Sequence, residues 1–192
     1  AAGLIAAGSA EVVVAGGAEN MSRAPFASLN MRWGSRMGDS KMVDMMVGAL
    51  HDPFQTIHMG VTAENIAKKW GITRDDQDAL ALESHLRAER ATAQGRFTDQ
   101  IVPVMLKTRK GDVAYATDEH FRTGATAEDF SKLKPVFIKE NGTVTAGNAS
   151  GINDAAAAVV LMDAQVAQQR GLKPMARLVA YAHAGVDPAY MG

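Results

Sequence analysis

The stretch from Thr143 to Asp154 is the part of the sequence best suited to hold a ligand. It reads Thr-Val-Thr-Ala-Gly-Asn-Ala-Ser-Gly-Ile-Asn-Asp and runs directly into an apolar segment that ends at Met162. Its small residues let the backbone pass close to a bulky ligand, its glycines permit positive φ, and its amide and hydroxyl groups can bind polar atoms. An ordinary connection between a loop and a strand fits the same local pattern equally well.

His58 is a second candidate for ligand binding. Met59 and Gly60 follow it, directly ahead of a helix that we expect Thr62 to cap. A histidine before a helix N-terminus can line a pocket and donate a hydrogen bond, and the adjacent glycine allows close approach. On local grounds alone, the simpler interpretation is a histidine whose ring is satisfied by nearby backbone.

Familiar catalytic and metal motifs do not account for these segments. The sequence has 5 histidines, and none has the spacing of a recognised metal site, so we expect no bound metal. The serine within residues 147–151 stands one place late for the nucleophile elbow of hydrolases. Neither a P-loop nor a dinucleotide fingerprint occurs. The basic turn at 109–112 indicates a solvated hairpin tip, with a phosphate site as the alternative.

Composition excludes several classes of function. The 192 residues are 47% hydrophobic and 21% charged, and 20 basic against 21 acidic residues leave a formal charge of −1. This balance gives no electrostatic case for a nucleic-acid partner. No apolar run approaches the roughly 20 residues of a membrane span, so we expect no membrane insertion. With no cysteine and no basic flank ahead of the Ala-rich start, nothing indicates secretion, and the cytoplasm is the expected compartment.

Buried strands that alternate with helices predict an α/β fold. The expected elements are a strand at 11–17, helices at 62–70 and 73–94, a hairpin of 101–106 and 113–116, a strand at 155–162, a helix at 163–170 and a strand at 178–182. The helix at 73–94 is specified best, because Thr73 and Asp76 form a capping-box pattern and Gly95 follows its end. Periodicity leaves 155–162 open between helix and strand; the flanking turns and paired valines favour a buried strand.

Other segments carry weaker signals. Residues 21–50 are rich in Met and Gly and predict loops and short helices. The first turns, 1–8, predict the end of a buried helix without an N-cap before it. Because residue 1 is Ala and the strand at 178–182 has nothing after it to pack on, we expect this chain to be the middle of a longer protein.

Three long motifs in order along the chain resemble the thiolase family, the acetyl-CoA acetyltransferases and β-ketothiolases. They are Val-Ala-Gly-Gly-Ala-Glu-Asn-Met-Ser at 14–22, His-Met-Gly-Val-Thr-Ala-Glu-Asn at 58–65, and the stretch from Thr143 to Asp154. The resemblance covers essentially the whole chain. Residues 48–54 resemble the β-ketothiolase branch in particular.

The resemblance implies a layered fold built from two similar α/β halves, each with a mixed five-stranded sheet and helices. Residues 1–20 and 150–170 would then belong to the N-terminal thiolase domain. Residues 21–149 would form an inserted α+β loop domain that covers the coenzyme A site, and residues 171–192 would begin the C-terminal domain. The family is usually tetrameric through the loop domain, so a homotetramer is expected.

The same resemblance implies a thiolase, an acetyl-CoA C-acyltransferase that condenses two acyl-CoA molecules or cleaves a 3-oxoacyl-CoA with coenzyme A. Its chemistry is ping-pong on a cysteine. That cysteine would lie upstream of Ala1, and the activating histidine and a second cysteine would lie beyond Gly192. No catalytic residue is therefore expected in this chain, which should be inactive alone. A non-catalytic module that binds acyl-CoA or mediates assembly is the alternative.

By resemblance, this chain supplies the surface that binds coenzyme A as substrate, with no covalently bound cofactor. The positions that match the family's site are Leu50, His58, Met59, Arg122, Phe137, Ala146, Gly147 and Ser150. Ser150 would bind the pantetheine, and Arg122 would stack on the adenine. One departure is Asp129, where the best-known members carry a serine. A carboxylate there either points away from the phosphates or weakens their binding.

Overall fold

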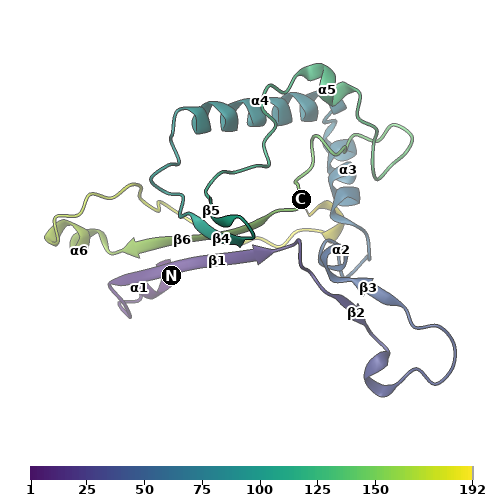
Figure 1. The fold of residues 1–192 in the computed structure, drawn as a ribbon, viewed down its shortest axis with the longest axis horizontal. Helices are drawn as coiled ribbons and strands as arrows, with labels where there is room; N and C mark the ends of the chain where they lie inside the picture. Colours follow the sequence, from purple (N-terminus) through teal and green to yellow (C-terminus); the bar gives the residue numbers. More distant parts are fainter. Residues whose placement is uncertain (192) are drawn as a thin grey trace. The chain divides into compact units, whose positions relative to one another are not determined.

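The computed structural model describes residues 1–191, which fold into two compact units. The first consists of Ala1–Gly48 and Ile152–Val186, and the second of Ala49–Gly151 with the segment from Asp187 onward. Figure 1 follows the elements along the chain. Each unit is described by itself below.

The first unit contains a two-stranded antiparallel sheet of β1 (Val12–Asn20) and β6 (Asp154–Met162). The register pairs Val12 with Met162 and Asn20 with Asp154. The strand assignment at 155–162 is confirmed. Gly16 lets the strands lie close, since a Cβ there would stand 2.9 Å from the carbonyl oxygen of Ala157.

Across residues 1–191 the strands form three separate two-stranded sheets. The expected burial of both strand faces is wrong for the described residues, because Val14 is 70% and Val160 is 67% exposed. A strand with one partner in a two-stranded sheet has too few neighbours to bury its β-branched side chains.

Short elements complete the first unit. They are α1 (Ala2–Ala6), β2 (Phe26–Ser28), η1 (Met31–Trp33), β3 (Met42–Asp44), α2 (Met45–Ala49) and α6 (Ala164–Gln169). The helix at 163–170 is confirmed, with Asp163 as its N-cap. The helix near residue 1 is present but not buried. The expected strand at 178–182 is wrong: it has no partner strand and is irregular.

In the second unit, α3 (Met59–Trp70) begins earlier than expected. Its N-cap is His58, whose ring nitrogen Nδ1 accepts a hydrogen bond from the Gly60 amide at 2.9 Å. Thr62 lies inside the first turns, where its hydroxyl donates to the carbonyl oxygen of Met59. The prediction of Thr62 as the cap is therefore wrong, whereas Gly71 ends the helix with φ of 67° as expected.

Helix α4 (Arg74–Ala93) follows after a short turn and matches its prediction. The hydroxyl of Thr73 accepts from the Asp76 amide, and the Asp76 carboxylate accepts from the Thr73 amide at 2.9 Å. Both halves of the capping box are present. The box fixes the start of a 20-residue helix, which provides a rigid support for the loops beside it.

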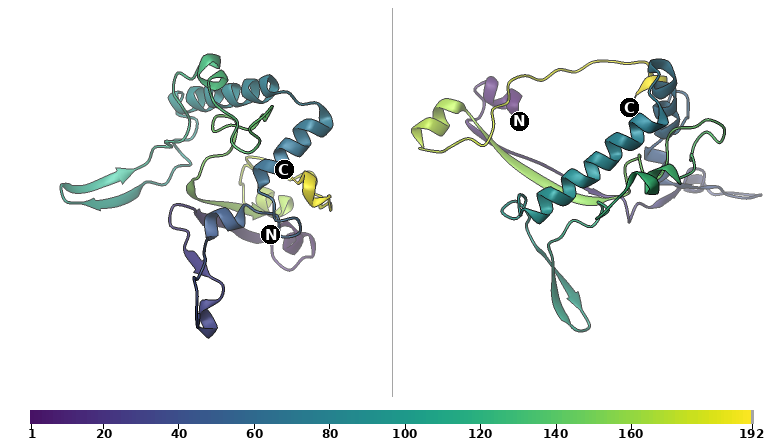
Figure 2. Two further views of the ribbon diagram at one scale, coloured as in Figure 1. Left: turned by 90° about the vertical axis from the view of Figure 1, so that its right-hand side faces the viewer. Right: turned by 90° about the horizontal axis from the view of Figure 1, so that it is seen from above.

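The rest of the second unit consists of a hairpin and two short helices. The predicted hairpin is β4 (Val104–Thr108) with β5 (Gly111–Tyr115), which extends away from α4 (Figure 2). Its basic tip is exposed. Two short helices are α5 (Ala127–Ser131) and η2 (Pro188–Tyr190). The latter packs on α3, where the Asn65 side chain donates to the carbonyl oxygen of Ala189 at 3.0 Å.

The small core of this unit is formed by side chains from α3, from α5 and from the segment around Thr143. Its buried members are Thr62, Glu64, Ala67, Phe130, Val144 and Thr145. Half of these side chains are polar, so the core depends on hydrogen bonds as well as on apolar contact. Within residues 1–191, no helix is long and apolar enough to cross a membrane.

Candidate functional site

The helix that follows His58 and the Thr143–Asp154 stretch are joined through one buried carboxylate. Glu64, on α3, is 5% exposed. Its oxygens accept from the Thr143 amide at 2.9 and 3.0 Å, the Thr143 hydroxyl at 2.8 Å and the Val144 amide at 2.9 Å. Two of the three family-like motifs are therefore held together by direct hydrogen bonds.

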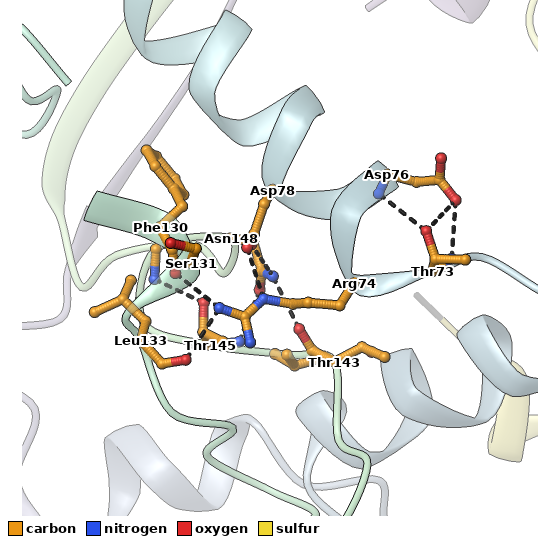
Figure 3. A network of polar contacts seen from close by, with 12 residues as sticks. Thr73, Arg74, Asp76, Asp78, Phe130, Ser131, Leu133, Thr143, Thr145 and Asn148 are labelled. Carbon is orange, nitrogen blue, oxygen red and sulfur yellow. Dashed lines mark hydrogen bonds and ion pairs between the residues drawn. The ribbon is translucent and has the colours of Figure 1, made fainter. Parts of the chain in front are cut away.

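The loop that follows Thr145 is shaped by Asn148 (Figure 3). The Asn148 side-chain oxygen accepts from the Thr145 amide at 2.7 Å, and its nitrogen donates to the Thr143 carbonyl at 2.9 Å. The Thr145 hydroxyl in turn accepts from the Gly147 amide at 3.2 Å. These bonds hold residues 145–148 as a tight turn, on which Ala146 is exposed.

Gly147 is required by close packing beneath this loop. A Cβ at Gly147 would stand 2.5 Å from Cδ1 of Leu133 and 3.0 Å from Cδ1 of Phe130. Any larger residue would push the loop outward from α5. Ser150 follows at the exposed end of the loop, and the next residue, Gly151, lies directly against the His120 ring.

Four predicted residues come together beside α3. The His58 ring stacks on Phe137 with centroids 4.6 Å apart and planes at 28°. The Met59 amide donates to the carbonyl oxygen of Leu50 at 2.8 Å. Gly60 permits the stack, because a Cβ there would stand 2.0 Å from the Phe137 ring. Leu50, His58, Met59 and Phe137 form a half-buried, largely apolar patch.

Burial lowers the pKa of His58, and the neighbouring His51 lowers it further. The two rings meet edge to face at 5.2 Å. Because Nδ1 accepts the Gly60 amide, the proton of the neutral ring lies on Nε2. His58 thus keeps one N–H that can donate to a ligand. The His58 ring therefore binds local backbone through Nδ1 and can still donate to a ligand through Nε2.

This lowered pKa predicts a pH dependence of stability. Below the unfolded-state pKa of about 6.5, the unfolded chain binds a proton that folded His58 does not. The free energy of unfolding should therefore fall as the pH drops from 6.5 toward the lower folded pKa. Urea unfolding at several pH values between 7.5 and 5 checks this. His58→Gln should show a weaker dependence than the wild type; equal slopes would contradict the assignment.

Arg122 lies on a loop whose backbone amides donate hydrogen bonds to side chains of α4. The Arg122 amide donates to Nδ1 of His85 at 3.0 Å, and the Gly124 amide donates to the Glu89 carboxylate at 3.1 Å. Burial lowers the pKa of His85, with smaller contributions from His120 and Arg122, which keeps Nδ1 an acceptor. The Arg122 side chain is exposed and available to a ligand.

Asp129, the departure from the family pattern, is engaged by its own helix. Its carboxylate accepts from the Thr126 amide at 2.9 Å and the Thr126 hydroxyl at 2.7 Å, completing a capping box on α5. The hydrogen bond from the Thr126 side chain, and then that from its backbone, lowers the pKa of Asp129. In the structure this carboxylate therefore faces the N-terminus of its own helix.

Sequence reasoning missed the residues that hold these parts in place. Glu64 was inside a recognised motif but had no assigned role, and Asp78 had none. Asp78 accepts from the Asn148 side chain at 2.9 Å. A signal for Glu64 was available, since a carboxylate on the inner face of a helix needs buried donors. Asp78 gives no such signal, because its i,i+4 partner Arg74 suggests an ordinary surface ion pair.

Other places in the described residues are less suited to ligand chemistry. A cavity of about 230 Å³ lies between the end of α4 and the base of the hairpin. It is lined by Thr92, Gly95, Phe97, Thr98, Ile101, Pro103, Ala116, Thr117 and Asp118. None of the predicted site residues is among them. Over residues 1–191, no group of three or more His, Cys, Asp or Glu side chains could hold a metal ion.

Comparison with known proteins identifies the family. Residues 1–165 match the N-terminal domain of thiolases. The chain belongs to the thiolase family. Beta-ketothiolase BktB of Cupriavidus necator is 64% identical to this thiolase chain over 192 residues, which is 100% of the chain and 49% of that protein. Acetyl-CoA acetyltransferase of Rhizobium meliloti is 55% identical over 98% of the chain and 48% of its own length.

Solved structures confirm a thiolase-like α/β fold. Acetyl-CoA acetyltransferase of Bacillus anthracis superposes with a TM-score of 0.90 at 48% identity, over 97% of this thiolase chain and 47% of that one. Human mitochondrial 3-ketoacyl-CoA thiolase in complex with CoA gives 0.87 at 40% identity, over 98% and 47%. The chain spans about half the length of the curated relatives it matches.

Proposed function

We propose that this chain supplies the coenzyme A-binding surface of a thiolase, an acetyl-CoA C-acyltransferase. The observation that carries the proposal is the joining of α3 to the Thr143–Asp154 stretch through Glu64. That contact brings the apolar patch of His58 and Phe137 into the same folded unit as the small-residue loop 146–150. Thiolase family membership supports an acyl-CoA ligand for this surface.

The geometry supports a distinct role for each part of the surface. Phe137 and Leu50 provide apolar walls for the pantetheine chain, and Met59 adapts to its shape. Ala146 and Gly147 let the backbone come close to the ligand, and the exposed hydroxyl of Ser150 binds a pantetheine amide. The Nε2–H group of His58 donates to a polar atom of the same chain.

At the nucleotide end, Arg122 stacks its guanidinium plane on the adenine. Such an arrangement adds cation–π and stacking attraction that a lysine would not supply. Asp129 binds Thr126 and so leaves the phosphates without a carboxylate aimed at them. The backbone bonds from Arg122 and Gly124 to α4 fix this loop before the ligand arrives.

The chemistry of the complete protein needs groups that this chain does not carry. The sequence contains 0 cysteines, so we propose that the nucleophilic cysteine, its activating histidine and the second cysteine come from other segments. In that scheme the acyl group is transferred to the cysteine and then to the second substrate, while this chain holds the coenzyme A part. Alone, this chain is expected to be inactive.

The proposed organisation follows the family. Residues 1–20 and 150–170 belong to the N-terminal thiolase domain, 21–149 to the loop domain, and 171–192 to the start of the C-terminal domain.

We propose a homotetramer that assembles through the loop domain. Exposed apolar side chains on the β4–β5 hairpin support an assembly role, since Met105 is 58% and Val113 is 53% exposed. Light scattering that gives a monomeric mass for the complete protein would refute the tetramer.

The experiment for the proposed function is Ser150→Ala in the complete protein. Losing one hydrogen bond to the ligand should raise the KM for acyl-CoA about 3- to 10-fold, with kcat changed less, because the bond is made equally in ground and transition states. Steady-state thiolysis kinetics measure KM and kcat, and titration calorimetry with coenzyme A measures the dissociation constant. Ser9→Ala, at another exposed serine, is the control. An unchanged KM for Ser150→Ala would count against the site.

A further inference from the structure

We propose that Asp78 is a positioning residue for coenzyme A binding. It does not contact the proposed ligand surface itself; it fixes Asn148, and through Asn148 the loop 145–150. This inference rests on the proposed function of that loop. The Asp78 side chain is 14% exposed and lies on the rigid helix α4.

The two oxygens of Asp78 have different partners. Oδ2 accepts from Nε of Arg74 at 2.7 Å, within the same helix. Oδ1 accepts from Nδ2 of Asn148 at 2.9 Å, across 70 residues of sequence. Figure 3 shows Asp78 between the guanidinium and the amide. An ionised carboxylate can only accept hydrogen bonds, so both neighbours must present N–H groups to it.

This requirement sets the orientation of the Asn148 amide. With the nitrogen toward Asp78 and the carbonyl of Thr143, the side-chain oxygen must face the Thr145 amide, which it accepts at 2.7 Å. If the amide turned over, its NH₂ group would face the Thr145 N–H, and two donors would meet. The carboxylate thereby stabilises, together with the Thr143 carbonyl and the Thr145 amide, the amide orientation that closes the tight turn.

Arg74 ties Asp78 to a second support of the same loop. One guanidinium nitrogen donates to the carbonyl oxygens of Phe130 and Leu133, at 2.7 and 3.0 Å. Phe130 and Leu133 are the side chains that lie beneath Gly147. Asp78 thus links the hydrogen bonds inside the loop to the residues that pack under it, and both are anchored to α4.

The consequence is an effect on binding that exceeds the effect on chemistry. Without the carboxylate, Asn148 loses one of the three partners that hold its amide, and the 145–150 loop gains alternative conformations, which must be reordered when the ligand binds. Asp78 lies outside the proposed ligand contacts, so loss of its charge leaves the reacting groups unchanged. Affinity for the pantetheine portion should therefore fall while kcat is retained.

The test is Asp78→Asn in the complete protein, with coenzyme A and pantetheine as probes. The dissociation constant for both should rise about tenfold, equivalent to about 1.4 kcal/mol, with kcat within about twofold. Glu83→Gln is the matched control: Glu83 also pairs with an arginine four residues away at 2.7 Å on α4, but is 42% exposed. It should bind both probes as the wild type does. Arg122→Ala should weaken only coenzyme A, because pantetheine lacks the nucleotide.

A second variant, Asn148→Ala, leaves the Arg74–Asp78 pair intact and carries the test if Asp78→Asn does not fold. It should weaken binding of both probes, and adding Asp78→Asn to it should cause a smaller loss than Asp78→Asn causes in the wild type, because only the path through Arg74 remains. Wild-type affinity in Asp78→Asn or Asn148→Ala, or additive effects in the double variant, would overturn the positioning role. So would a loss confined to kcat. A wild-type protein without measurable affinity for coenzyme A would instead overturn the proposed function.

Discussion

Replacing Glu64 by alanine is expected to lower the free energy of unfolding by about 3–5 kcal/mol, because it leaves several donors without their charged acceptor in a buried place. The Thr143 amide and hydroxyl and the Val144 amide all donate to this side chain. Glu64 is 5% exposed, so water cannot readily take its place. The affinity for coenzyme A should fall as well, since the small-residue loop follows these donors directly.

Urea unfolding of the complete protein measures the Glu64 effect, with Glu83→Ala as its control. Glu83 lies on α4 and bonds Arg87 and Arg90, but its side chain is 42% exposed. Exposed ion pairs contribute about 0–1 kcal/mol, so the control should differ little from the wild type. Similar losses in the two variants would contradict the role given to Glu64.

Gly142→Ala is expected to have the second large effect, a loss of about 3 kcal/mol of stability. A Cβ at this position would stand 2.1 Å from the carbonyl oxygen of Ile138 and 2.8 Å from Cβ of Pro135. A backbone oxygen cannot rotate away as the end of a side chain can. The turn that leads into Thr143 would have to open, and the contact with Glu64 would be strained.

Thermal and urea unfolding of Gly142→Ala, beside Gly185→Ala, check this prediction. At Gly185 an added Cβ meets nothing within 4 Å, and the backbone needs no positive φ. Alanine there should be neutral or slightly stabilising, because it restricts the unfolded chain. A Gly142→Ala protein as stable as the wild type would show that the 138–142 turn differs from the one described.

Helices with complete local signals could be predicted from the sequence. The capping box of Thr73 and Asp76 and the cap at Asp163 depend on residues three or fewer positions apart, and both helices start where expected. Helix α3 was placed too late because a histidine ring nitrogen caps it. Ser, Thr, Asp and Asn are the usual caps, so Thr62 looked the better candidate.

Strands were harder to predict from the sequence than helices, because a strand forms only where a second strand is available to pair with it. Residues 155–162 and 178–182 have similar β-branched character, but only the first pairs with another strand, β1. The sequence pattern describes a surface that suits a sheet, and it does not say which strands are present to pair. The same limit explains why Val14 and Val160 are exposed in the described chain.

The resemblance selected several residues that lie together in the structure. The rings of His58 and Phe137 stack, and Gly147 lies so close to Phe130 and Leu133 that a side chain would not fit. The supports were not predictable, since the bond from Asn148 to Asp78 spans 70 residues. The role of such a residue follows from a tertiary contact, and its local sequence suggests only a surface ion pair.

A crystal structure of the complete protein with bound coenzyme A tests the central claim most directly. The account predicts that the pantetheine chain lies against residues 146–150 and beside the His58–Phe137 stack, with the adenine on Arg122. Coenzyme A bound at another surface, with these residues free of ligand contact, would contradict it.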